Sequence, residues 1–247
     1  MSSSVELEVA YRIGNAPMQT FPFPHIYVRD VFPAAFYGEL LEHLPPPEQL
    51  TPIEQARSIK GYRDRFVQEM SAQKLAGVAE PYRGFWSKLA GWMVGGRFAQ
   101  LVMQKFGPFI QERFKDRPEA ALTDEALLVY DRTNYSLGPH TDMPSKVVAM
   151  LFYLPRDERL ARYGTSIYVP KDATFTCAGG PHYPFEGFER MVTMPFLPNS
   201  MFAFAKTQNS FHGVEPIREQ GVGRYLLLYD LREAPAASSA SGVKFSG

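Results

Sequence analysis

The chain has 247 residues, of which 45% are hydrophobic, so it can fill a large core and is neither a disordered tail nor a small stapled scaffold. Its 26 lysines and arginines balance its 26 aspartates and glutamates, which argues against a basic nucleic-acid-binding protein. Cys177 is the only cysteine, which excludes an intrachain disulfide framework and a multi-thiolate metal site. The N-terminus lacks a secretory signal pattern and the apolar runs are short, so a cytoplasmic protein without a membrane span is expected.

The N-terminal half has mostly helical patterning. Residues 21–33 predict an extended strand interrupted by prolines, and the residues that follow predict a helix that ends at three consecutive prolines. Between 61 and 115, apolar residues recur every three or four positions, which predicts helices that pack one face on a sheet. The pair Gly95 and Gly96 is expected to kink or split this helical stretch. Residues 21–120 should therefore form an α-rich support.

The C-terminal half has the texture of an all-β structure. Short runs of branched and aromatic residues (ALLVY, KVVAMLFYL, TSIYV, SMFAFA, RYLLLYDL) are separated by Gly, Pro, Asn and Asp. This spacing is typical of a β-sandwich, barrel or jelly roll over residues 124–232. No flexible linker separates the halves, so we expect one α+β domain of residues 1–232 with a mainly β core. Residues 233–247 are small and polar, which predicts a disordered tail.

Three residues form a candidate metal site. His140 and Asp142 follow a Gly-Pro pair that predicts a turn and, in an extended segment, would project to the same side. His212 lies 70 residues after Asp142, at the end of the run SMFAFAKTQNSFHG. Two histidines and one carboxylate are the ligand set of non-haem Fe(II) oxygenases, which leaves coordination positions open for substrates.

A candidate carboxylate-binding residue follows the second histidine. Arg224 lies twelve residues beyond His212 and opens the strand RYLLLYDL. A guanidinium can hold a carboxylate through two parallel hydrogen bonds, as a dicarboxylate co-substrate would need. Arg218 is the alternative, although its polar neighbours predict an exposed turn.

The order of these parts resembles the 2-oxoglutarate- and Fe(II)-dependent oxygenases, in particular the bacterial members of the prolyl-4-hydroxylase-like branch. The resembling stretch runs from Leu127 to Leu231. It includes VYDRTNYSLGPHTD, KVVAMLFYLP with GTSIYVP, and FHGVEPIREQGVGRYLLLYDL; the segment FPFPHIYVRDVFP resembles the N-terminal section of the branch. Two features depart from the common pattern: arginine stands where many prolyl hydroxylases have lysine, and Gly164-Thr165 stands where Gly-Gly is frequent.

The resemblance implies a double-stranded β-helix, also called a jelly roll, supported by N-terminal helices. It implies Fe(II) held by His140, Asp142 and His212, with 2-oxoglutarate and O₂ as co-substrates and ascorbate as a candidate stimulant. Arg224 would hold the distal carboxylate of 2-oxoglutarate, and the motif position of Tyr130 suggests a second contact to it. The implied reaction is hydroxylation of a C–H bond with release of succinate and CO₂.

Substrate identity is less defined by the sequence. Lys146, Arg132 and Asn134 lie close in sequence to the His-x-Asp motif and could reach an anionic substrate, with surface solvation as the alternative for each. The aromatic segment 171–190, which carries His182, fits either a lid over the substrate or an ordinary packed loop. A small molecule, a sugar or glycan, or a peptide remains open as substrate, and the chain is expected to be a monomer or homodimer.

Two other functions compete with the hydroxylase. A non-catalytic jelly-roll module that binds a metal or a sugar would explain the predicted barrel, but not the combination of His-x-Asp, distant histidine and following arginine. A cupin-like metal dioxygenase that does not use 2-oxoglutarate would leave Arg224 without a role.

Overall fold

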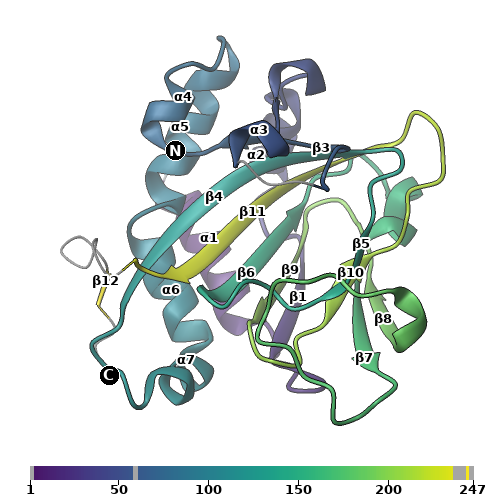
Figure 1. The fold of residues 1–247 in the computed structure, drawn as a ribbon. Coiled ribbons are helices and arrows are strands. Elements are labelled where there is room, and N and C mark those ends of the chain that lie inside the picture. The colour runs from purple at the N-terminus through teal and green to yellow at the C-terminus, as the bar shows by residue number, and fades with distance from the viewer. Residues whose placement is uncertain (1–2, 58–60, 236–242, 245–247) are drawn as a thin grey trace.

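The computed structural model describes residues 3–57, 61–235 and 243–244 as two antiparallel β-sheets with helices (Figure 1). The described α-helices are α1 (Ser3–Asn15), α2 (Ala34–Glu42), α3 (Ile53–Ala56), α4 (Ala72–Leu75), α5 (Tyr82–Met93), α6 (Arg97–Lys105) and α7 (Gly107–Phe114), and the 3-10 helices are η1 (Pro47–Gln49), η2 (Glu158–Tyr163) and η3 (Phe185–Gly187). The strands are β1 (His25–Arg29), β2 (Thr51–Pro52), β3 (Arg65–Glu69), β4 (Ala121–Arg132), β5 (Leu137–His140), β6 (Lys146–Tyr153), β7 (Thr165–Pro170), β8 (Phe188–Met194), β9 (Ser200–Ala205), β10 (His212–Val214), β11 (Gly223–Glu233) and β12 (Val243–Lys244).

The strands are distributed between the sheets so that distant segments become neighbours. The larger sheet has the order β1-β9-β6-β11-β4-β3-β2, with β12 paired to β4, and the smaller sheet has the order β5-β10-β7-β8. From β4 to β11 the chain therefore crosses repeatedly from one sheet to the other. This crossing pairs β5 directly with β10, although the two strands are far apart in the sequence.

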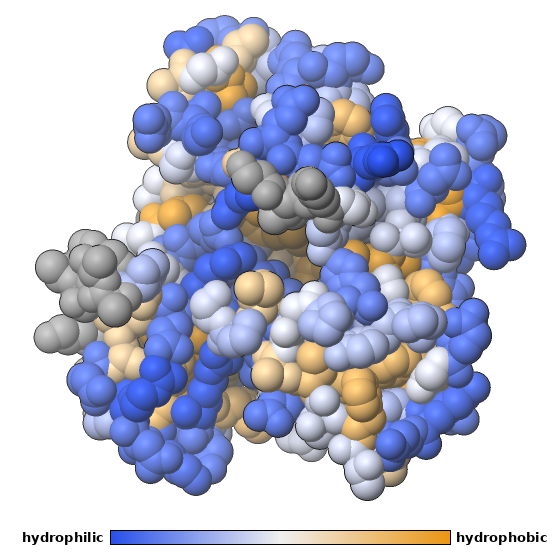
Figure 2. Space-filling view, viewed as in Figure 1, coloured by the Kyte–Doolittle hydropathy of each residue, from blue (hydrophilic) through white to orange (hydrophobic). Residues whose placement is uncertain are grey.

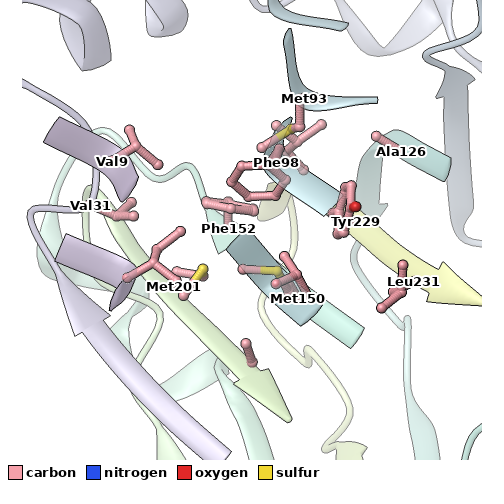
Figure 3. Packing of buried hydrophobic residues seen from close by; sticks show 14 of the residues in the cluster. Val9, Val31, Met93, Phe98, Ala126, Met150, Phe152, Met201, Tyr229 and Leu231 are labelled. Carbon is pink, nitrogen blue, oxygen red and sulfur yellow. The ribbon is translucent and has the colours of Figure 1, made fainter. Parts of the chain in front are cut away.

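The larger sheet separates two hydrophobic layers because side chains alternate along each strand. On β11, Leu227, Tyr229 and Leu231 belong to the cluster that packs against the helices, whereas Leu226 belongs to the cluster on the opposite, inner face. Figure 3 shows part of the helix-side cluster, where Phe98 of α6 meets Phe152 of β6 and Tyr229. The inner face looks toward the smaller sheet and carries the polar residues discussed below.

Most predicted elements are confirmed. The helix after residue 33 ends before the three prolines, and α5 and α6 are separated at Gly95-Gly96. All five predicted C-terminal runs form strands: β4, β6, β7, β9 and β11. Among the described residues, no helix is both long enough and apolar enough to cross a membrane.

The structure differs from the expectations at several points, and it contains one helix that was not predicted. The stretch 61–115 is not wholly helical, because Arg65–Glu69 forms β3 at one side of β4. The Gly-Pro pair before His140 lies within a strand rather than a turn. An additional helix, α1, precedes the predicted support, and its Val9 and Ile13 are fully buried. Of the predicted tail 233–247, residues 236–242 and 245–247 lie outside the described residues; Glu233 ends β11, and Val243–Lys244 pairs with β4.

Replacement of Phe152 by alanine should destabilise the fold strongly. Phe152 is fully buried and its ring lies 5.4 Å from that of Phe32, so truncation leaves a cavity between the helices and the larger sheet. We expect a loss of about 3–5 kcal/mol in the free energy of unfolding, measured by urea denaturation. Leu7→Ala is the control, because Leu7 is 69% exposed and should change the free energy by less than about 0.5 kcal/mol. Equal effects of the two substitutions would contradict this packing.

Candidate metal centre

The pairing of β5 with β10 brings two distant histidines together. His140 and His212 are direct partners in the antiparallel register, and their ring centroids lie 4.3 Å apart. Asp142, two residues beyond the end of β5, joins them. One potential ligand atom from each of the three residues lies within 4.8 Å of the others, and all three residues are buried. The structure therefore brings together the three residues that the sequence analysis selected as metal ligands.

The hydrogen bonds of the cluster leave the appropriate atoms available. His140 Nδ1 lies 3.0 Å from the Gly138 carbonyl oxygen, and His212 Nδ1 lies 3.0 Å from the Ser210 carbonyl oxygen. Each Nδ1–H can donate to its carbonyl, which leaves Nε2 as a free electron-pair donor. Asp142 Oδ2 is buried without a hydrogen-bond partner and lies 3.9 Å from His212 Nε2. A buried, unpaired carboxylate oxygen beside two free imidazole nitrogens fits a divalent metal ion.

The electrostatic environment favours the protonation states that bind metal. Burial lowers the pKa of His140 well below its usual value, and the neighbouring His212 lowers it further. Burial also lowers the pKa of His212. For Asp142, burial alone would raise the pKa, but Lys146 and the two histidines outweigh it and hold the pKa below its usual value. Near neutral pH the site therefore has neutral imidazoles and an ionised carboxylate, which are the ligand forms.

Lys146 supports Asp142 from the first residue of β6. Its ammonium lies 3.0 Å from Asp142 Oδ1 and 3.1 Å from Asp230 Oδ2. Because both contacts are ion pairs with neighbouring carboxylates, Lys146 orients the carboxylate of Asp142 rather than presenting a free charge to a substrate. The ion pairs continue away from the site through Arg232, Glu125, Arg57 and Glu69.

A glycine permits the close approach that fixes the Asp142 loop. Gly179 has a φ of +131°, a conformation that L side chains rarely adopt, and a Cβ there would lie 2.1 Å from the Asp142 carbonyl oxygen. Nearby, the Thr141 hydroxyl donates to the Cys177 carbonyl oxygen at 2.9 Å. The segment after β7 is therefore locked against the backbone that carries Asp142.

Arg224 lies on the inner face of β11 and is 1% exposed. Its guanidinium donates to Asp131 Oδ2 at 2.9 Å and to the Tyr163 carbonyl oxygen, and it lies 5.5 Å from the centre of the Phe196 ring. Its Nε has no hydrogen-bond partner, and neither does the buried Thr165 Oγ1. Arg218, the alternative, is exposed in the connection between β10 and β11. Of the two arginines, Arg224 is the one placed between the sheets.

Arg224 has two buried neighbours that the sequence motifs did not indicate. Asp131 is fully buried and also accepts two hydrogen bonds from Arg65, at 2.6 and 2.9 Å. Two guanidinium groups thus share one carboxylate, which leaves one positive charge uncompensated. Tyr153, whose pKa is raised by burial to about 12, faces the same interior and accepts a hydrogen bond from the Thr165 N–H at 3.2 Å. The position of Asp131 in the sequence could have identified it. Asp131 follows Leu127 and Val129 at intervals of two residues, so all three side chains lie on the same inner face of β4.

The expected partnership of Tyr130 with Arg224 does not fit the strand register. Arg224 is opposite Asp131, whereas Tyr130 is opposite Tyr225, one position away. Neighbouring positions on a strand face opposite sides of the sheet, and Tyr130 and Tyr225 pack against the helix-side cluster. Their ring centroids lie 4.8 Å apart. The structure therefore separates Tyr130 from the inner face on which Arg224 lies.

The remaining substrate candidates differ in position. Arg132 is paired with Asp64 at 3.1 Å with its side chain 54% exposed, and Asn134 occupies a turn with a φ of +76°. The structure does not bring either residue to the histidines. His182 does reach the site: its ring centroid lies 4.6 Å from that of His140, and its Nε2 is 3.0 Å from the Tyr62 hydroxyl.

A few aromatic side chains and backbone hydrogen bonds anchor segment 171–190, although most of its residues are exposed. Phe175, Tyr183 and Phe188 surround Phe211 in an aromatic cluster, and the Tyr183 N–H donates to the Pro139 carbonyl oxygen at 2.9 Å. His182 is therefore presented beside His140 by an anchored segment.

Figure 2 shows that the face of the molecule seen in Figure 1 is hollowed where β11 passes, with hydrophobic residues inside the hollow and hydrophilic residues around it.

Comparison with known proteins gives structural neighbours only. No family model matches the sequence, and no curated protein matches it. The structure is similar to a prolyl-4-hydroxylase from Pseudomonas putida, with 12% identity, 92% of this chain and 100% of that chain covered, and a TM-score of 0.47. It is similar to an oxidoreductase of the 2OG-Fe(II) oxygenase family from Burkholderia pseudomallei, with 12% identity, coverages of 98% and 94%, and a TM-score of 0.48. It is also similar to HygX from Streptomyces hygroscopicus with nickel and 2-oxoglutarate bound, with 12% identity, coverages of 85% and 83%, and a TM-score of 0.48.

At 12% identity, the assignment of chemistry to particular residues depends on the geometry of this chain.

Substitution of Lys146 by methionine should weaken metal binding. Methionine keeps the apolar length of the side chain but removes the charge that orients Asp142 and lowers its pKa. Loss of such a supporting contact typically costs about 10–100-fold in metal affinity. Titration with Co(II) at pH 7, followed by absorbance, measures this effect. Lys115→Met, which removes an exposed lysine paired with Glu112, is the control and should bind Co(II) like the unmodified protein; equal affinities in all three proteins would refute the supporting role.

Proposed function

We propose that this chain is an Fe(II)- and 2-oxoglutarate-dependent dioxygenase that hydroxylates a C–H bond. The observation that carries the proposal is the buried cluster of His140, Asp142 and His212, whose free Nε2 atoms and unpaired Oδ2 converge. Three protein ligands from two histidines and one carboxylate leave positions for 2-oxoglutarate and O₂. Fe(II) bound there would couple decarboxylation of 2-oxoglutarate, which yields succinate and CO₂, to oxidation of the substrate.

In this proposal Arg224 binds the distal carboxylate of 2-oxoglutarate. The cation is on the inner face of the sheet, and its Nε and the Thr165 hydroxyl have no protein partner. His212 and Arg224 border the same inner hydrophobic cluster, through Phe204 and Phe196 respectively. An apolar lining that excludes water would strengthen both the ion pair and the metal–ligand bonds.

We also propose that the two sheets form a double-stranded β-helix within one domain of residues 1–232. The strand orders support this: β4, β6, β9 and β11 lie in the larger sheet, and β5, β7, β8 and β10 form the smaller one. Each sheet therefore receives alternate parts of the same chain segment, as in jelly rolls.

The substrate of the proposed enzyme would pass His182 and Tyr62, which are joined by a hydrogen bond beside His140. Both side chains offer polar contacts, and the ion pairs that extend from Lys146 add charged groups near the site. A polar small molecule, a glycan or a peptide fits these surroundings. The competing metal- or sugar-binding module would use the same metal cluster but would not turn over 2-oxoglutarate.

The variant His212→Ala should abolish Fe(II)-dependent succinate formation. Removing one of three ligands leaves the metal held by His140 and Asp142 alone, and we expect at least about a 100-fold loss of activity. Succinate is measured with the purified chain, Fe(II), 2-oxoglutarate and O₂. His43→Ala is the matched control. The His43 ring stacks on the Phe85 ring with 4.7 Å between their centroids, and His43 is not part of the metal cluster. If the unmodified chain binds Fe(II) but forms no succinate with any substrate tested, the binding-module function is favoured.

Conservative replacement of Arg224 by lysine should raise the 2-oxoglutarate concentration needed for half-maximal succinate formation. Lysine keeps the positive charge but cannot form two parallel hydrogen bonds, so we expect an increase of about 10-fold or more. The increase should appear in KM for 2-oxoglutarate, while the affinity for Fe(II) is retained. Arg218→Lys serves as the control because its side chain is exposed. A raised KM in Arg218→Lys alone would transfer the role to Arg218.

A further inference from the structure

A cavity outside the candidate metal centre is lined in part by the helix-side hydrophobic cluster. It has a volume of about 430 Å³ and lies between α7 and the ends of β6 and β9. Its apolar wall includes Phe109, Ile110, Val147 and Ala205, and its polar wall includes Arg113 and Lys206. None of these residues takes part in the proposed binding of Fe(II) or 2-oxoglutarate.

The two cations at this cavity lack acidic partners. Lys206 is 8% exposed, and its ammonium donates to the Ala178 carbonyl oxygen at 2.5 Å. Arg113 donates only to the carbonyl oxygens of Pro144, Lys146 and Lys206. Within the part of the chain that the structure describes, no carboxylate lies within 4.0 Å of either cation. Glu112, the acidic residue in the cavity wall, pairs with Lys115 instead.

The burial of Lys206 and the partial burial of Arg113, without a directly paired carboxylate, make this arrangement costly. Burial lowers the pKa of Lys206, and the neighbouring Arg113 lowers it further. Burial also lowers the pKa of Arg113. Glu233 acts on Arg113 and Asp142 acts on Lys206, but neither carboxylate forms an ion pair with its cation. The neutral carbonyl oxygens satisfy some donors without cancelling the two positive charges, and charges that are even partly buried in folded proteins are generally paired.

Donor atoms remain available for a ligand. A lysine ammonium has three N–H donors, of which Lys206 uses one, and the Nε–H of Arg113 makes no hydrogen bond to a described residue. A carboxylate can accept from an ammonium and a guanidinium at once. Because the rest of the wall is largely apolar, the body of the ligand would be apolar as well.

We propose that the cavity between α7 and the ends of β6 and β9 binds a small carboxylate with an apolar body, held by Lys206 and Arg113. The carboxylate supplies the missing negative charge, and Phe109, Ile110 and Val147 cover the apolar part. The site is separate from the proposed 2-oxoglutarate site, because Arg113 and Lys206 line a different cavity from the space that contains Arg224.

Benzoate is a suitable probe, and benzyl alcohol is its uncharged counterpart. Calorimetric titration of the full chain without added metal should show saturable binding of benzoate and at least 10-fold weaker binding of benzyl alcohol. Lys206→Met should weaken benzoate binding at least 10-fold. Ala178→Leu, which keeps both cations but fills part of the cavity, should weaken it as well, and this variant keeps the test valid if Lys206→Met folds poorly.

Two control variants separate this site from the one proposed for 2-oxoglutarate. Arg224→Lys should leave benzoate binding unchanged, and so should Lys88→Met, which removes an exposed lysine on α5 outside the cavity wall. Benzoate binding that is lost in Arg224→Lys but kept in Lys206→Met and Ala178→Leu would overturn the proposal. So would the absence of benzoate binding to the unmodified chain, since the cations would then only fasten the backbone. Neither result affects the test of succinate formation, so the two proposals fail independently.

Discussion

The antiparallel pairing of β5 with β10 is the interaction on which the candidate site depends. It places His140 directly opposite His212, and the register shifts between His212 and Val214. A slip of one residue would turn either imidazole to the other face of the smaller sheet. Asp142 lies beyond the paired residues, so its position depends on Lys146 and on the backbone contact with Gly179. Two residues of the cluster are thus fixed by strand pairing and the third by side-chain and loop contacts.

The larger sheet positions Arg224 because its inner face and its helix-side face carry alternate residues of each strand. Arg224 and Tyr225 are neighbours in sequence, yet Arg224 contacts Asp131 on the inner face and Tyr225 packs on the helix side. The helices bury the outer face and so determine which alternate residues of β4 and β11 turn inward. An α-rich N-terminal half therefore contributes to the chemistry indirectly, by fixing the orientation of strands that lie far away in sequence.

The sequence predicted the parts of this arrangement that depend on local patterns. Alternating and apolar runs identified β4, β6, β7, β9 and β11, and a His-x-Asp motif with a distant histidine identified the cluster. What it could not predict depends on contacts between distant segments. Arg65 pairs with Asp131 across β3 and β4, and His182 reaches His140 from a loop.

Tyr130 shows the limit of reasoning from motif position. Its place in the motif suggested a contact with the co-substrate, but the register that sets Asp131 opposite Arg224 turns Tyr130 toward the helices. A motif fixes the order of residues along the chain, whereas the face on which each residue lies is decided by strand pairing and by which side is buried.

The inner face of the larger sheet carries two groups of buried ion pairs with opposite net charge. At one end of the inner face begins an ion-pair network with four negative charges, on Asp142, Asp230, Glu125 and Glu69, and three positive charges, on Lys146, Arg232 and Arg57. At the other end, Arg65, Arg224 and Asp131 contribute two positive charges and one negative charge. Buried ion pairs seldom stabilise a fold more than apolar residues would, so their presence calls for a functional reason. The first group has a surplus that suits a cation, and the second has a surplus that suits an anion. A metal ion beside Asp142 and a carboxylate beside Arg224 would neutralise both, and a dicarboxylate that chelates the metal through its other end is the simplest ligand that connects them.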